Sequence, residues 1–171
     1  MQSIRVGMGF DVHRFAEGRM LWLGGVQIKH EKGLLGHSDA DVIIHALCDA
    51  LLGAAGLRDI GFHFPDTDDA YKDVDSKILL KETMELLRSK SYELGNADIT
   101  VCAETPRLNP YIPAMITCLS ETMQVTQDSV SIKATTSEKM GYIGREEGIA
   151  AYATVLIYKK DLSTNCHRFS I

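Results

Sequence analysis

Val6-Gly7-Met8-Gly9-Phe10-Asp11-Val12-His13 combines the pattern of a β-strand with two side chains that can bind a metal ion. The segment is the end of a strand predicted over residues 4–13. Side chains two positions apart on a strand point the same way, so Asp11 and His13 would project together. The two glycines of the segment stand on alternate positions, which often marks the close approach of another backbone or of a ligand.

A predicted helix supplies a third potential ligand. It begins at Ser38, a good N-cap, with Asp41 in the capping-box position, and it ends at Gly56. His45 lies at the edge of its apolar stripe, where the side chain could reach the end of the first strand. Two imidazoles and one carboxylate make a zinc-binding set with an open fourth position, as in catalytic sites. The alternative is an ordinary core histidine beside a polar strand end.

The rest of the pattern predicts an α+β fold, in which helices cover one face of a mixed sheet. Residues 20–26 are expected to return as a strand in a hairpin with the first. The other expected elements are strands at 96–103, 130–135 and 149–158 and helices at 76–89 and from Asn109-Pro110 onward. We expect one domain over residues 1–160 and a flexible tail over 161–171.

Apolar residues occupy both parities of the last predicted strand, from Ile149 to Ile157, which predicts that both of its faces are buried. A homo-oligomer that apposes its sheets would bury the second face. A monomer whose last strand lies in the middle of the sheet is the alternative, and spacing alone does not decide between them.

Composition limits the class of protein. The 171 residues carry a net charge of −5 and no basic run, which argues against nucleic acid as the main partner. The four cysteines form no CxxC pair and fit reduced thiols of a cytosolic protein. No segment is long enough to span a bilayer, and the N-terminus has no apolar targeting region. These features predict a cytoplasmic protein without a membrane partner.

Several polar residues suit a phosphate. Two predicted loops, 59–69 and 136–145, have the length and composition of functional loops. Anion binding is expected from His37 and Ser38 at the predicted helix N-terminus, from the hydroxyls of Thr135, Thr136 and Ser137, and from the cations Lys133, Lys139 and Arg145. Glu138 could hold a hard cation such as Mg²⁺ that bridges phosphates. Taken singly, each of these residues is explained by a cap, a strand threonine or a surface charge.

Several longer motifs follow one another along the chain. They are Phe10-Asp11-Val12-His13, His37-Ser38-Asp39-Ala40-Asp41-Val42, His45-Ala46, Asp49-Ala50-Leu51-Leu52-Gly53-Ala54-Ala55, Asp59-Ile60-Gly61, Phe64-Pro65-Asp66-Thr67-Asp68, Lys133-Ala134-Thr135-Thr136 and Gly144-Arg145-Glu146-Glu147-Gly148-Ile149-Ala150. In this order they resemble the 2-C-methyl-D-erythritol 2,4-cyclodiphosphate synthase family, from about residue 4 to residue 159. Collinear motifs of this length are far more specific than one short pattern.

The resemblance implies a homotrimer whose sheets face the three-fold axis, with active sites between neighbouring subunits. It implies a phosphorus–oxygen lyase of the non-mevalonate (MEP) isoprenoid pathway. The 2-phosphate of 4-diphosphocytidyl-2-C-methyl-D-erythritol 2-phosphate would attack the β-phosphorus, giving CMP and the cyclic diphosphate. A central cavity of the trimer would be able to hold an isoprenoid diphosphate.

The resemblance also implies the roles of single residues. Asp11, His13 and His45 would hold one Zn²⁺ per subunit with an open fourth position, and Glu138 would contact Mg²⁺ or Mn²⁺ on the substrate diphosphate. His37 and Thr136 would be catalytic, by stabilising charge on the phosphates. The residues expected to bind substrate are Asp11, His13, His37, Ser38, Asp59, Ile60, Gly61, Phe64, Pro65, Asp66, Thr67, Asp68, Ala103, Glu104, Thr105, Pro106, Arg107, Leu108, Asn109, Lys133, Thr135, Thr136, Ser137, Glu138, Tyr142 and Arg145.

Four positions depart from the usual pattern of the family, namely Ala40, Arg58, Glu104 and Tyr142. None removes an expected metal or phosphate ligand, although Glu104 bears on nucleotide affinity. Two other functions fit the same residues. One is a zinc-dependent phosphohydrolase acting on a phosphate ester. The other is a non-catalytic trimer that binds an isoprenoid diphosphate in its central cavity.

Overall fold

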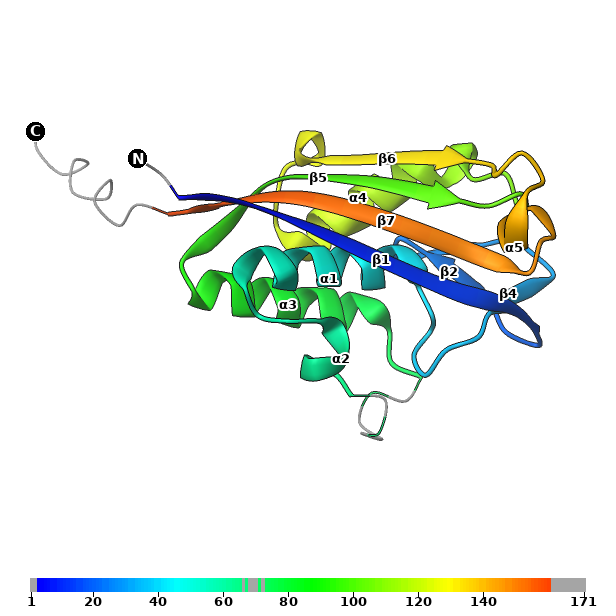
Figure 1. Ribbon diagram of the computed structural model, residues 1–171, viewed down its shortest axis with the longest axis horizontal. Helices are drawn as coiled ribbons and strands as arrows, with labels where there is room; N and C mark the ends of the chain where they lie inside the picture. The colour runs from blue at the N-terminus through cyan, green and yellow to red at the C-terminus, as the bar shows by residue number, and fades with distance from the viewer. Residues whose placement is uncertain (1–2, 66, 68–70, 72, 161–171) are drawn as a thin grey trace, which may run out of the picture.

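A five-stranded mixed sheet in the order β4-β1-β7-β5-β6 carries helices on one face (Figure 1). The computed structural model describes residues 3–65, 67, 71 and 73–160. The strands are β1 (Ile4–Glu17), β2 (Leu21–Leu23), β3 (Val26–Ile28), β4 (Lys32–Leu34), β5 (Tyr92–Cys102), β6 (Val130–Thr135) and β7 (Gly148–Lys159). The helices are α1 (Val42–Ala55), α2 (Ile60–His63), α3 (Ser76–Ser89), α4 (Ile112–Met123) and α5 (Gly141–Gly144). Turns of 3-10 helix lie at Asn109–Tyr111 and Gln127–Ser129.

The sheet is built around β7. Strand β1 pairs with it antiparallel from Ile4 opposite Tyr158 to Arg14 opposite Gly148. Strand β5 pairs antiparallel on its other side, and β6 adds a parallel edge to β5. The α+β class and the helices on one face are therefore as predicted. Among the described residues, no helix combines the length and hydropathy needed to cross a bilayer.

Helix α1 lies directly against β1 because two glycines leave room for its backbone. A Cβ atom added to Gly7 would lie 2.0 Å from the carbonyl oxygen of Ala50, and one added to Gly9 would lie 1.9 Å from that of Ala46. Both distances are far shorter than a van der Waals contact. The expectation that these glycines mark a close approach is confirmed, and the approaching group is the helix backbone.

One face of the sheet is buried and the other is open in the single chain. On β7, the odd-numbered side chains from Ile149 to Ile157 pack into the core, whereas the even-numbered Tyr152 is 43% exposed. Strand β1 presents Ile4, Val6, Met8, Phe10 and Val12 on the open face. The prediction that both faces of the last strand are buried is wrong for one chain, because the helices cover only one of them.

The prediction that residues 20–26 form one strand paired with the first is also wrong. Gly24 and Gly25, both at positive φ (58° and 74°), split it into β2 and β3, which pair with each other. Strand β1 runs on to Glu17 and pairs with β4 instead, with Phe15 opposite Leu34. The glycine pair forms a tight turn that ends the strand early.

Helix α1 begins at Val42, four residues later than predicted. The carboxylate of Asp41 accepts the backbone N–H groups of Ile43 (3.1 Å) and Ile44 (3.2 Å), so Asp41 is the N-cap in place of Ser38. Ala40 has a left-handed φ of 58°, which a preceding helical turn could not contain. His37 and Ser38 therefore lie in the loop before the helix, and their predicted place at a helix N-terminus is wrong.

Candidate metal centre and active site

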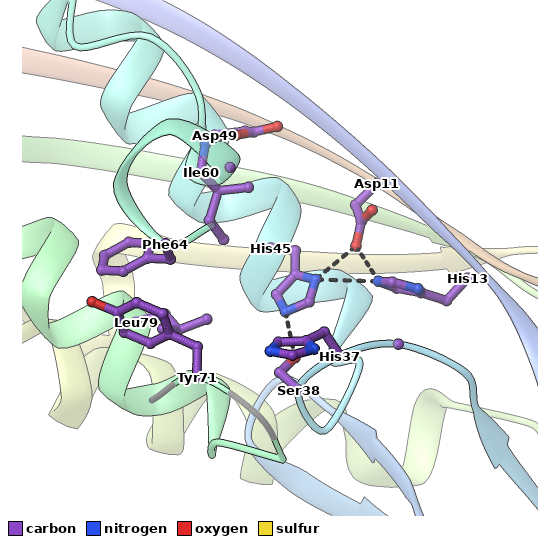
Figure 2. Close-up of a pocket in the computed structure, with 12 residues that line it drawn as sticks. Asp11, His13, His37, Ser38, His45, Asp49, Ile60, Phe64, Tyr71 and Leu79 are labelled. Carbon is purple, nitrogen blue, oxygen red and sulfur yellow. Dashed lines mark hydrogen bonds and ion pairs between the residues drawn. The ribbon is translucent and has the colours of Figure 1, made fainter. Parts of the chain in front are cut away.

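Asp11, His13 and His45 converge at one point, where the middle of β1 meets the first turn of α1 (Figure 2). Asp11 Oδ2 lies 3.0 Å from His13 Nε2 and 3.0 Å from His45 Nδ1. The two imidazole nitrogens are 3.2 Å apart. Two ligand atoms from β1 and one from α1, at least 32 residues further along the chain, thus form a small triangle. The predicted meeting of these side chains is confirmed.

The triangle fits a tetrahedral metal ion. Ligand atoms bound at about 2.0–2.1 Å from Zn²⁺ in tetrahedral geometry are separated by about 3.3 Å. The three observed separations lie within a few tenths of an ångström of that value. All three side chains are partly exposed, His45 least at 14%, so a fourth ligand can approach from solvent.

The far side of each imidazole is also held. His13 Nδ1 lies 2.8 Å from the carbonyl oxygen of Leu35, an acceptor that keeps the proton on Nδ1 and leaves the Nε2 lone pair for a metal. His45 Nε2 lies 3.1 Å from the hydroxyls of both Ser38 and Ser76. Partners of this kind orient histidine ligands in metal sites.

The charge state of the site favours a cation. Burial alone raises the pKa of Asp11, but its hydrogen bonds and charge interactions with His13 and His45 outweigh burial and hold the pKa below the ordinary value. Burial alone lowers the pKa of His45, but the hydrogen bond and charge of Asp11 raise it overall. Asp11 is therefore an anion that stabilises a positive charge beside it, either a proton on His45 or a metal ion.

The three ligands open into a cavity of about 250 Å³. Figure 2 shows the hydrophobic side chains of Phe64, Tyr71 and Leu79 on the wall away from the ligands. The cavity is lined by Asp11, His13, Gly36, His37, Ser38, His45, Asp49, Ile60, Gly61, Phe64, Tyr71 and Leu79. Of the nine lining residues other than the three ligands, five were expected from the sequence, namely His37, Ser38, Ile60, Gly61 and Phe64. The other four were missed, namely Gly36, Asp49, Tyr71 and Leu79.

The 59–65 segment reaches this cavity through α2. Asp59 caps the helix by accepting the N–H of Phe62 at 2.9 Å, so its carboxylate has a local structural partner. Asp49 accepts the N–H of Ile60 at 2.7 Å and fixes the helix to α1. Burial raises the pKa of Asp49 above its ordinary value. Its position four residues after His45, on the same helix face, was the signal that could have identified it.

Four other residues of the predicted 59–69 loop have different outcomes. Pro65 and Thr67 are described but are not among the residues that line the cavity. Asp66 and Asp68 lie outside the described residues, so their expected contacts with substrate stay predictions.

A second cavity, of about 520 Å³, lies where β5 and β6 end. It shares no lining residue with the first cavity. Most of the residues between 103 and 109 that were expected to bind substrate are here, together with Thr135 and Thr136. The cavity is lined by Ala103, Glu104, Pro106, Arg107, Leu108, Asn109, Pro110, Ala134, Thr135 and Thr136. Thr105 is absent from that lining and instead borders a separate cavity beside Phe15 and His30. Within one chain, the residues expected to bind substrate are therefore divided between two separate cavities.

The 136–140 segment beside the second cavity is held by Glu104. One oxygen of its carboxylate accepts the N–H and hydroxyl of Ser137 (2.9 and 3.0 Å) and the N–H of Lys139 (3.2 Å). The hydroxyl of Thr136 donates to Glu138 Oε1 at 3.1 Å. Glu104, a departure from the family pattern, thus orders the segment that carries three predicted site residues, Thr136, Ser137 and Glu138.

The remaining predicted contacts lie on exposed surface. Lys133 is ion-paired with Asp98 on the neighbouring strand, and Arg145 is ion-paired with Glu147 at 2.6 Å. Tyr142, 39% exposed, lies in α5 beyond the second cavity. Of the cysteines, Cys48, Cys102 and Cys118 are free, which agrees with the predicted reduced thiols.

Comparison with known proteins agrees with this geometry. A sequence model of the YgbB family matches residues 4–158. The 2-C-methyl-D-erythritol 2,4-cyclodiphosphate synthase of Bacteroides fragilis is 64% identical over 155 residues, which cover 91% of this chain and 98% of that protein.

Solved structures show the same fold. The bifunctional IspDF of Campylobacter jejuni matches with a TM-score of 0.91 and 45% identity over 94% of this chain, which spans only 44% of that larger protein. The CDP complex of IspF from Plasmodium falciparum matches with a TM-score of 0.82 and 35% identity, over 93% of this chain and 98% of that one. From the family match, the close relative and the shared fold, we conclude that this chain belongs to the YgbB family of 2-C-methyl-D-erythritol 2,4-cyclodiphosphate synthases.

Proposed function

We propose that this protein converts 4-diphosphocytidyl-2-C-methyl-D-erythritol 2-phosphate to 2-C-methyl-D-erythritol 2,4-cyclodiphosphate and CMP, as a phosphorus–oxygen lyase of isoprenoid biosynthesis. The oxygen of the 2-phosphate forms a bond to the β-phosphorus, and the bond from that phosphorus to the CMP oxygen breaks. The observation that carries the proposal is the triangle of Asp11, His13 and His45 at the mouth of a cavity, in a chain of this family.

Asp11, His13 and His45 would hold Zn²⁺, whose positive charge, when it is bound, draws electron density from a β-phosphate oxygen. His37 and Ser38 border the same cavity and would orient the phosphates. The apolar wall of Phe64 and Leu79 excludes water from the methylerythritol end. Holding both reacting phosphates in one orientation supplies the proximity part of catalysis.

The other half of the site would bind the cytidine diphosphate arm. Ala103, Glu104, residues 106–109 and Thr135 border a cavity large enough for a nucleoside, of about 520 Å³. The hydroxyl of Thr136 turns the Glu138 carboxylate, at 3.1 Å, so that it can contact Mg²⁺ or Mn²⁺ bound to the diphosphate. Cytidine diphosphate is the ligand in the complex of the Plasmodium falciparum relative, which supports this assignment.

A homotrimer would join the two halves, the metal cavity of one subunit meeting the cytidine cavity of its neighbour. Two observations support it. The cavities share no lining residue within one chain. In addition, Ile4, Val6 and Met8 on the open face of β1 are 61–66% exposed, which is a large apolar surface for an isolated subunit. Subunits would pack with their sheets toward the three-fold axis, and Arg145 and Glu147 would border the central cavity.

The proposal includes the cytoplasmic location and the single domain over residues 1–160 expected from the sequence. Its test is incubation of the protein with the cytidyl substrate, Zn²⁺ and Mg²⁺ in water enriched in ¹⁸O, followed by phosphorus NMR and mass spectrometry. We expect a cyclic diphosphate and CMP, both free of solvent oxygen. A linear phosphate that carries ¹⁸O would instead identify a phosphohydrolase. Sedimentation analysis should give three times the mass of one chain, and a monomer that turns over the substrate would refute the shared site.

A further inference from the structure

The imidazole of His45 is supported from behind by a buried serine of another helix. Ser76, the first residue of α3, is fully buried, and its hydroxyl oxygen lies 3.1 Å from His45 Nε2. This contact is on the side of the ring opposite Nδ1, the nitrogen that faces Asp11 and His13. The two residues are 31 positions apart in the chain, so only the packing of α3 against α1 brings them together.

The direction of each hydrogen bond follows from Asp39. Its carboxylate accepts the Ser76 hydroxyl at 2.5 Å through one oxygen and the Ser76 backbone N–H at 3.1 Å through the other. A carboxylate can only accept hydrogen bonds, so the Ser76 hydroxyl must donate its single proton to Asp39. The lone pairs of Ser76 are then left for His45, and Nε2 must be the donor.

Asp39 is itself fixed in place. Its carboxylate also accepts the N–H of Asp41 at 3.2 Å, and its own N–H donates to the carbonyl oxygen of Val74, just before α3, at 3.1 Å. The loop before α1 and the start of α3 are thereby joined. The chain of hydrogen bonds from Asp39 through Ser76 to His45 is therefore anchored at both ends.

The second hydroxyl near His45 does not impose a direction. Ser38 Oγ also lies 3.1 Å from Nε2, and it accepts the N–H of Ala40 at 3.1 Å. Its proton can point either to Ser76, at 3.4 Å, or to His45. Ser38 is thus compatible with both forms of the ring, whereas the pair of Ser76 and Asp39 is compatible with one.

We propose that Asp39 and Ser76 are positioning residues of the metal centre, which hold the His45 proton on Nε2 and so present the Nδ1 lone pair to a metal ion beside Asp11 and His13. The inference rests on the metal site of the proposed function. Neither residue touches the metal or the substrate. Their effect is to fix the ring orientation and to keep a proton on Nε2, which leaves Nδ1 as the nitrogen that can bind the metal ion.

The test measures metal binding directly. Metal-stripped wild type, Ser76→Ala, Asp39→Asn and Asp11→Ala are titrated with Zn²⁺ in competition with a chromophoric chelator, and the absorption spectrum of the Co²⁺ form of each is recorded. Ser120→Ala is the matched control, because Ser120 is a buried serine of α4, away from the metal site, whose hydroxyl donates to the backbone carbonyl oxygen of Thr117 in the same helix at 2.9 Å. Circular dichroism confirms that each variant is folded without metal.

We expect Ser76→Ala and Asp39→Asn to weaken Zn²⁺ binding about 10- to 100-fold and to change the Co²⁺ spectrum, while Ser120→Ala matches wild type. In Asp39→Asn the amide can donate to Ser76, whose proton then turns to His45 and forces the wrong tautomer, although the side chain keeps its shape. If Ser76→Ala does not fold, Asp39→Asn decides the question.

Two failures are distinguishable. If wild type binds Zn²⁺ and Asp11→Ala does not, but a folded Ser76→Ala or Asp39→Asn binds with wild-type affinity and spectrum, the positioning role is overturned alone. If wild type and Asp11→Ala bind Zn²⁺ equally weakly, the metal site itself is wrong, and the proposed function is overturned together with this inference.

Discussion

Replacement of Gly9 by alanine should separate the metal ligands without touching any of them. The added Cβ would lie 1.9 Å from the carbonyl oxygen of Ala46 and 2.7 Å from the backbone nitrogen of Ala50, both on α1. Because these atoms belong to the helix backbone, no change of side-chain rotamer relieves the overlap. Either α1 or β1 must move.

The size of the movement follows from the contact distance. Ordinary contact begins at 3.4 Å, so the helix must retreat by about 1.5 Å from the strand. His45 is the neighbour of Ala46 and moves with it. The separation of His45 Nδ1 from Asp11 Oδ2, now 3.0 Å, would grow toward about 4.5 Å, well beyond the spacing of about 3.3 Å that tetrahedral Zn²⁺ allows. We expect Zn²⁺ affinity to fall about 100-fold and the free energy of unfolding to fall by about 3 kcal/mol.

The assay pairs urea unfolding, followed by circular dichroism, with Zn²⁺ titration of the metal-stripped protein. Gly53→Ala is the matched control, because Gly53 lies in the same helix and nothing is within 4 Å of its added Cβ. That variant should bind Zn²⁺ like wild type and gain about 0.5–1 kcal/mol of stability. A Gly9→Ala protein with unchanged metal affinity and stability would refute the view that close packing of α1 on β1 assembles the site.

Three other outcomes follow from the same contacts. Asp41→Ala should lower the free energy of unfolding by about 4 kcal/mol. Four backbone N–H groups, two in α1 and two in the Gly24–Gly25 turn, would lose their acceptor, at about 1 kcal/mol each. Urea titration measures the loss. Asp11 raises the pKa of His45 above 6.5, so a proton competes with the metal at higher pH than at an ordinary imidazole. The Zn²⁺ affinity should therefore still be rising with pH above 6.5, and a plateau below that pH in chelator competition would contradict this. Burial raises the pKa of Cys48 to about 12, so iodoacetamide should label it only after urea unfolds the protein, as peptide mass spectrometry would detect.

Local pattern predicted the elements that bear the ligands. The alternation of β1 put Asp11 and His13 on one side, and helical spacing put His45 at the edge of an apolar stripe, and both expectations are confirmed. Where two local signals competed, the interpretation was wrong. Ser38 and Asp41 both suit an N-cap, and only the left-handed Ala40 between them shows which one starts the helix.

The sequence by itself determined the kinds of chemistry available: two imidazoles and a carboxylate on a strand and a helix, loops rich in hydroxyls, and collinear motifs of one enzyme family. Tertiary structure alone decided that β1 pairs with β7 and β4, that Asp49 and Tyr71 enter the cavity, and that Ser76 and Asp39 stand behind His45. The physical reason is the distance along the chain over which each kind of signal acts. Strand and helix periodicity records which residues share a face over a few positions, whereas contacts between residues 31 positions apart depend on how closely helices and strands pack. For α1 and β1, the close packing depends on the absence of a side chain at Gly7 and Gly9.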